Sequence, residues 1–178
     1  MKKFLKIIVA LFCAISIFGC EKDDICPDTT PTTPRLIFEF YEFNNPNVLR
    51  SVSNLKVFVN DTESVVLNES STATDSTKFI ATGTKIALPL DFNSSETTFK
   101  LRLDDPASSD PLVFFDDDMT ISYNSEQIYV SRACGFKTNF DIININQTDA
   151  VEDRWIKNLI IELPNVQTEN EIHVKIYF

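Results

Sequence analysis

The sequence predicts an all-β protein built as an antiparallel β-sandwich of about nine or ten strands. Apolar and polar residues alternate with a period of two in many short segments, which is the pattern of strands with one buried face. No stretch sustains a 3.6-residue period over three turns. Only two glycines follow residue 19, so the turns must use Asn, Asp, Ser and Pro. A closed β-barrel is the alternative architecture.

The first half of the domain contains several expected strands. In segment 36–41, Leu36, Phe38 and Phe40 share one parity, whereas Glu39 and Tyr41 have the other. A Ser/Thr-rich loop is expected after the third strand. The further strands expected in this half are 55–59, 65–67, 79–81 and 85–88. The Ser/Thr-rich loop is expected at 68–77.

The second half shows the clearest alternation of the chain at 99–103. A turn is expected at Asn124-Ser125, between two alternating segments. His173 has the outward parity of the final segment, so we expect its side chain on the surface. The other strands expected here are 119–123, 128–130, 140–145, 155–163 and 172–178, and the loop is 104–111.

The N-terminus has the layout of an export signal. A basic start precedes an apolar run at 7–18, which is too short to span a hydrocarbon core of ~30 Å. Gly19-Cys20 at the exit of this run resembles the lipobox of bacterial lipoproteins, in which the cysteine is lipidated and becomes the new N-terminus. An ordinary secretion signal with a coincidental cysteine is the alternative. We therefore expect a signal peptide at 1–19, a lipidated proline-containing tether at 20–34, and one β-sandwich domain at 35–178.

The residues after the expected lipid site carry charge. Lys22, Asp23 and Asp24 resemble the export signal of Bacteroidota lipoproteins, which implies the outer face of the outer membrane. A charged, solvated tether on a protein of the periplasmic face is the alternative.

The chain is acidic, with a formal net charge of −10. The expected signal peptide contains three lysines and no acid, so the mature chain carries −13. Such a chain lacks the Lys/Arg clusters that neutralise phosphates, which argues against nucleic acid as a partner. It also disfavours electrostatic adhesion to anionic lipid, so the acyl chains alone would attach the protein to the membrane.

Four cysteines are present. Cys13 would leave with the signal peptide and Cys20 would carry lipid, which leaves Cys26 and Cys134. In an exported chain this pair suggests one disulfide, worth about 4–5 kcal/mol for so long a loop. Two unpaired thiols are the alternative.

Two segments resemble a known family. Cys20–Cys26 and Ser131–Phe140, with 34–43 as the opening strand, are similar to an uncharacterised family of short flavobacterial lipoproteins, a domain of unknown function. The resemblance implies location and fold class, and no activity. Within the second segment, Arg132 and Lys137 are candidate recognition residues; a structural corner is the alternative reading.

Catalytic chemistry has little support in the sequence. The chain has one histidine, no Gly-x-Ser-x-Gly elbow and no phosphate-binding glycine pattern, so we expect no enzyme. Asp116, Asp117 and Asp118 could offer oxygen ligands to Ca²⁺; the alternative is a solvated acidic loop at the start of a strand, which discourages edge-to-edge pairing. No other cofactor is expected. Outward aromatics that could line a sugar- or peptide-binding face, or could be cross-strand packing partners, are Tyr41, Phe58 and Tyr177.

These observations predict a lipid-anchored envelope protein with a non-enzymatic binding or structural β domain. Its expected partners are the membrane, through the N-terminal lipid, and an envelope protein or a glycan. A surface carbohydrate-binding or calcium-assisted adhesion module is the alternative, and a hydrolase using a carboxylate pair is a third reading.

Overall fold

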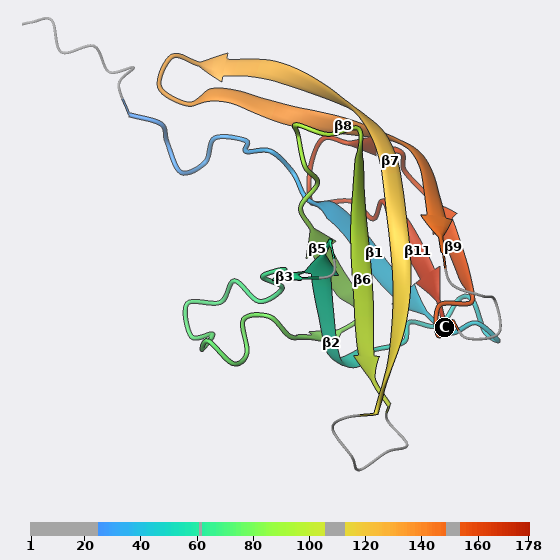
Figure 1. Ribbon diagram of the computed structural model, residues 1–178. Helices are drawn as coiled ribbons and strands as arrows, with labels where there is room; N and C mark the ends of the chain where they lie inside the picture. The colour runs from blue at the N-terminus through green and yellow to red at the C-terminus, as the bar shows by residue number, and fades with distance from the viewer. Residues whose placement is uncertain (1–24, 61, 106–112, 149–153) are drawn as a thin grey trace, which may run out of the picture. The chain divides into compact units, whose positions relative to one another are not determined.

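A computed structural model describes residues 25–60, 62–105, 113–148 and 154–178 (Figure 1). These residues form strands, turns and irregular segments without any helix, which confirms the predicted all-β class. Consistently, the described segments offer no helix of the length and hydropathy needed to cross a bilayer. The predicted signal peptide at 1–19 lies outside the described residues. So do Cys20, Lys22, Asp23 and Asp24.

Eleven strands occur in the described residues. Their bounds are β1 Leu36–Tyr41, β2 Val52–Val59, β3 Glu63–Ser64, β4 Ala81–Gly83, β5 Lys85–Leu88, β6 Glu96–Asp104, β7 Phe114–Ser131, β8 Gly135–Gln147, β9 Asn158–Ile161, β10 Asn165–Val166 and β11 Val174–Tyr177.

The strands form two sheets. The four-stranded sheet has the order β5-β1-β11-β9, and the seven-stranded sheet has the order β10-β8-β7-β6-β2-β3, with β4 paired to β2. Both orders are open paths, so the sandwich is confirmed and neither sheet closes as a barrel would. One pairing departs from the antiparallel expectation: β1 and β11 are parallel, with Phe38 opposite Val174. A parallel pair needs a long connection, and the whole intervening chain provides it.

The alternating segments form the core as predicted. Leu36, Phe38 and Phe40 of β1 are fully buried. In β6 and β7 the buried members of each alternating set belong to the same core cluster, namely Phe99, Leu101, Leu103, Met119, Ile121 and Tyr123. Each of these strands buries only one face, against the opposite sheet. For this reason the alternation of apolar and polar residues was enough to identify them in the sequence.

The described residues fall into two compact parts. The tip part comprises residues 25–30 and Tyr129–Phe136, and the sandwich part comprises Pro31–Ile128 and Lys137–Phe178. The predicted boundaries at residues 19 and 34 stay predictions.

The turn predicted at Asn124-Ser125 was wrong. Strand β7 continues through these residues, whose side chains are exposed, and ends at Ser131. Its neighbour β8 runs beside it (Figure 1). Backbone pairing with β8 satisfies the polar main chain here, so it overrides the local turn preference of Asn and Ser.

His173 is buried, so the expectation of a surface side chain was also wrong. The residue precedes β11, and the alternation of that strand does not extend back to it. The Ile37 N–H donates to its Nδ1 at 3.0 Å, and the His173 N–H donates to the Ile37 carbonyl at 3.1 Å. The imidazole therefore joins the start of β1 to the approach to β11.

The buried imidazole predicts a loss of stability in mild acid. Burial lowers the pKa of His173, and this outweighs the opposing effect of Glu171 and Glu169. In the unfolded chain the ring titrates near its ordinary pKa of about 6.5. As the pH falls through that value the unfolded state binds a proton that the folded state does not. The free energy of unfolding should therefore fall by up to about 1.4 kcal/mol per pH unit, until the folded pKa is reached.

Urea unfolding between about pH 7.5 and 5.5 measures this effect. The control is His173→Asn, whose side-chain oxygen can still accept the Ile37 N–H but does not titrate. We expect a smaller pH slope for the variant, and equal slopes in the two proteins would contradict the assignment.

Candidate functional site

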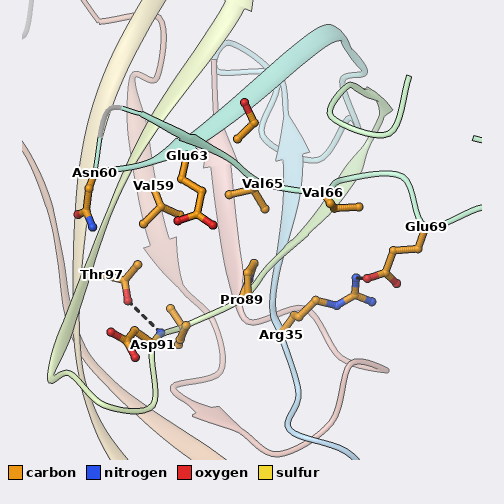
Figure 2. Close-up of a pocket in the computed structure, with 12 residues that line it drawn as sticks. Arg35, Val59, Asn60, Glu63, Val65, Val66, Glu69, Pro89, Asp91 and Thr97 are labelled. Carbon is orange, nitrogen blue, oxygen red and sulfur yellow. Dashed lines mark hydrogen bonds and ion pairs between the residues drawn. The ribbon is translucent and has the colours of Figure 1, made fainter. Parts of the chain in front are cut away.

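A pocket of about 530 Å³ opens in the sandwich part (Figure 2). Residues at the end of β2 and in β3 form one wall of the pocket, and the segment between β5 and β6 forms another. Arg35, which also lines the pocket, lies just before β1. The pocket therefore lies at the ends of strands from both sheets. Its lining residues are Arg35, Val59, Asn60, Glu63, Ser64, Val65, Val66, Glu69, Pro89, Leu90, Asp91 and Thr97.

Arg35 closes one end of the pocket through two carboxylates. Its Nε and Nη2 donate to the two oxygens of Glu169 at 2.9 and 2.6 Å, and its main-chain N–H also donates to Glu169 at 3.0 Å. The Nη1 atom lies 2.6 Å from Oε1 of Glu69. The hydrogen-bonded guanidinium lowers the pKa of the Glu169 carboxyl. Because the fork to Glu169 is bidentate, it fixes Arg35 against the segment between β10 and β11, and the Glu69 contact ties it to the loop after β3.

A hydroxyl network supports the other end. The Asp91 N–H donates to Thr97 Oγ1 at 3.2 Å, as the dashed line in Figure 2 shows. The Tyr123 hydroxyl donates to the Asp91 carbonyl at 2.7 Å and lies 2.6 Å from Thr97 Oγ1. Since the Tyr123 proton is committed to Asp91, Thr97 donates to the tyrosine oxygen. Each hydroxyl in this network thus donates once and accepts once.

Between these ends the pocket combines an apolar floor with acidic groups. Val65 and Leu90 are buried, whereas Glu63 is exposed and its carboxylate points into the pocket in Figure 2. Asn60 has a φ of 48°, a left-handed conformation that asparagine tolerates well, and it turns the chain from β2 towards β3. A ligand with a short apolar body and a group that donates hydrogen bonds or carries positive charge would complement the apolar floor and the acidic groups of this pocket.

The three aspartates predicted as calcium ligands do not converge. Asp116 pairs with Arg102 through two hydrogen bonds of 2.7 and 2.6 Å. Asp117 is buried and accepts the Ile156 N–H at 2.6 Å. Strand alternation places Asp117 on the face opposite to Asp116 and Asp118. Among the described residues, no cluster of three His, Cys, Asp or Glu side chains could hold a metal ion.

The three predicted outward aromatics do not form one face. Tyr41 and Tyr177 stack with centroids 5.5 Å apart, but Tyr177 is buried. The Tyr41 hydroxyl donates to Glu39 at 2.5 Å, which raises the pKa of Tyr41 to about 12. Phe58 belongs to the other sheet and lies below the Arg102 guanidinium. These rings are cross-strand packing partners, which was the alternative reading.

The tip part contains the predicted disulfide. Cys26 and Cys134 are bonded, with 4.9 Å between their Cα atoms, which confirms the prediction. The turn between β7 and β8 spans residues 132–134, and the Cys134 N–H donates to Ser131 Oγ at 3.1 Å. Gly135 has a φ of 72°, where a side chain would be strained.

The candidate recognition residues lie on either side of this turn in the sequence. Arg132 belongs to the tip part and its side chain is exposed. Lys137 belongs to the sandwich part and is half-buried. Their joint role in recognition stays a prediction.

Sequence reasoning missed a pair of exposed rings in the tip part. Tyr129 and Phe136 are 60% and 64% exposed, and their centroids lie 5.4 Å apart in an edge-to-face arrangement. The expected strand at 128–130 already gave Tyr129 an outward position, but no strand was expected before residue 140, so Phe136 was not recognised as its partner. The outward period of a single long hairpin would have identified both rings.

Comparison with known proteins places the chain in a family. No curated protein and no solved structure matches it. A family model described as a family of unknown function (DUF6452) matches residues 54–178, a span that contains the Ser131–Phe140 segment but not Cys20–Cys26. Since the match covers well over half of the sequence, this chain belongs to the family of unknown function DUF6452.

Proposed function

We propose that this protein is a lipid-anchored protein of the bacterial envelope, acylated at Cys20, whose β domain acts by binding or as a structural element and not by catalysis. We further propose that it is exposed on the outer face of the outer membrane and that its family consists of short lipoproteins of Bacteroidota. The basic start, the apolar run at 7–18 and Gly19-Cys20 support the anchor, and Lys22, Asp23 and Asp24 support the outer face.

The Cys26–Cys134 disulfide is the observation that carries the proposal. Disulfides persist in oxidising compartments and are rare in the cytosol. This bond begins six residues after Cys20, so it joins the expected tether to the turn between β7 and β8. An exported, anchored chain accounts for both the bond and its position.

The buried ionisable side chains support a binding or structural role. His173 and Asp117 are both fully buried, and each accepts a main-chain N–H from a distant segment, so each of these contacts ties two segments of the fold together. The pocket at Arg35 is the surface where we place the partner, and its exposed Glu63 is the group that we expect to contact it.

Mass spectrometry of protein purified from its native membrane tests the anchor. We expect an N-terminus at Cys20 that carries acyl chains, and a Cys20→Ser variant that stays unprocessed. An uncleaved or unacylated N-terminus in the wild-type protein would refute the proposal. Protease treatment of intact cells then separates the two faces of the outer membrane, because only a surface-exposed domain is digested.

Crosslinking in intact envelopes tests the pocket. We expect Glu63→Gln to reduce recovery of the crosslinked partner, and Glu126→Gln to leave it unchanged. Glu126 is the matched control because it is also an exposed glutamate of the sandwich part. A glycan array run with and without Ca²⁺ examines the adhesion module, and glycan binding that requires Ca²⁺ would favour that module over our proposal.

A further inference from the structure

We propose that the tip part is a membrane-contacting element: the Tyr129–Phe136 pair and Ile25 insert into the interfacial layer of the bilayer that holds the acyl chains of Cys20. This inference rests on the proposed lipid anchor. It adds a second point of attachment, which would fix the orientation of the tip part at the membrane surface.

The first support is apolar exposure. Ile25 is 80% exposed, and Tyr129 and Phe136 are more than half exposed. A tyrosine with an apolar ring and a polar hydroxyl suits the boundary between headgroups and hydrocarbon, where aromatic side chains are enriched. The three side chains come from the two segments that the disulfide joins.

The second support is the length of the tether. Cys26 lies six positions after Cys20, and a fully extended chain over that interval spans roughly 20 Å. The disulfide then brings the Cys134 Cα to 4.9 Å from the Cys26 Cα. The turn is therefore held within about 25 Å of the lipidated residue, although 114 positions separate Cys134 from Cys20 in the sequence. Any bilayer that contains the acyl chains is within reach of the tip.

The third support is charge. The mature chain that begins at Cys20 has a net charge of −13, which would oppose approach to an anionic surface. The described residues of the tip part carry one acid, Asp28, and one base, Arg132. The charges of these described residues cancel, and Glu21, Lys22, Asp23 and Asp24 of the sequence add −2 beside Cys20, so the electrostatic cost of lipid contact there is small compared with that of the acidic chain as a whole.

Fluorescence quenching by lipid tests the inference. The native acylated protein with Tyr129→Trp is placed in vesicles of phosphatidylcholine with brominated acyl chains. The only natural tryptophan, Trp155, is buried and gives a constant baseline. We expect loss of most of the emission that Tyr129→Trp adds. Phe92→Trp is the matched control, because Phe92 is 54% exposed and no disulfide ties its segment to the tether; its added emission should persist.

The outcomes separate this inference from the anchor. Vesicle-bound, acylated protein whose added indole at position 129 is not quenched would overturn the membrane contact and leave the anchor intact. Protein without acyl chains would refute the anchor itself. A Cys26→Ser, Cys134→Ser version of the Tyr129→Trp protein should lose quenching while it stays on the vesicles, and unchanged quenching would show that the tether does not place the tip.

Discussion

Replacement of Cys26 and Cys134 by serine is expected to lower the free energy of unfolding by about 4–5 kcal/mol. The bond joins residues 108 positions apart, so it closes a loop that contains every strand from β1 to β7. In the unfolded chain this closure removes conformational freedom, and the loss grows slowly with loop length. An effect of this size is a large share of the stability of a typical domain.

Denaturant unfolding of the mature protein measures the loss. The double serine variant should unfold at a lower midpoint than the oxidised wild type, and reductant should shift the wild type towards the variant. Reductant should leave the variant unchanged, which controls for other effects of the reagent. A midpoint equal to that of the oxidised wild type would show that the bond contributes no net stability.

Substitution of Tyr123 is expected to have the second large effect on the free energy of unfolding. Its side chain is fully buried, and its ring meets Phe140 edge-to-face at 5.3 Å. Tyr123→Ala should cost about 3–5 kcal/mol, because it leaves a large cavity between β6, β7 and β8. Tyr123→Phe keeps the ring but leaves the Asp91 carbonyl and Thr97 hydroxyl without their partner, which should cost roughly 1–3 kcal/mol.

Chemical denaturation of the two variants provides the measurement. Tyr129→Ala is the matched control, since Tyr129 is largely exposed and its replacement should change stability by no more than about 0.5 kcal/mol. If Tyr123→Phe matched the wild type, the hydroxyl network would contribute nothing, and partner crosslinking at the adjacent pocket should then be unaffected as well.

The strands could be predicted where one face is buried and the other exposed, because this imposes an alternation of apolar and polar residues on the sequence. Phe99, Leu101 and Leu103 alternate with polar residues because only one side of β6 faces the core. Alternation gave the wrong result at His173. Its buried ring accepts a hydrogen bond from the main-chain N–H of Ile37, which lies 136 positions away. Local sequence carries no information on such a partner, so an outward parity was assigned to a buried ring.

The candidate site was predictable only in part. Counting cysteines was enough to find the disulfide, because Cys26 and Cys134 were the one pair left once Cys13 and Cys20 were expected to belong to the signal peptide and the lipid site. The pocket could not be predicted, since Arg35 meets Glu169 from 134 positions away and only the parallel placement of β1 beside β11 brings their segments together. The alternation at 128–130 was enough to place the Tyr129 ring outward, whereas its pairing with Phe136 depends on β8 beginning at Gly135, before the expected segment 140–145.

The neighbours of β1 have a consequence for the timing of assembly. This strand is hydrogen-bonded on one side by β5 and on the other by β11, which lies at residues Val174–Tyr177. The strand cannot acquire both neighbours until the chain has been synthesised as far as β11. If the chain is exported as we propose, the four-stranded sheet should remain incomplete until β11 has crossed the membrane, so this part of the chain stays unfolded during transport.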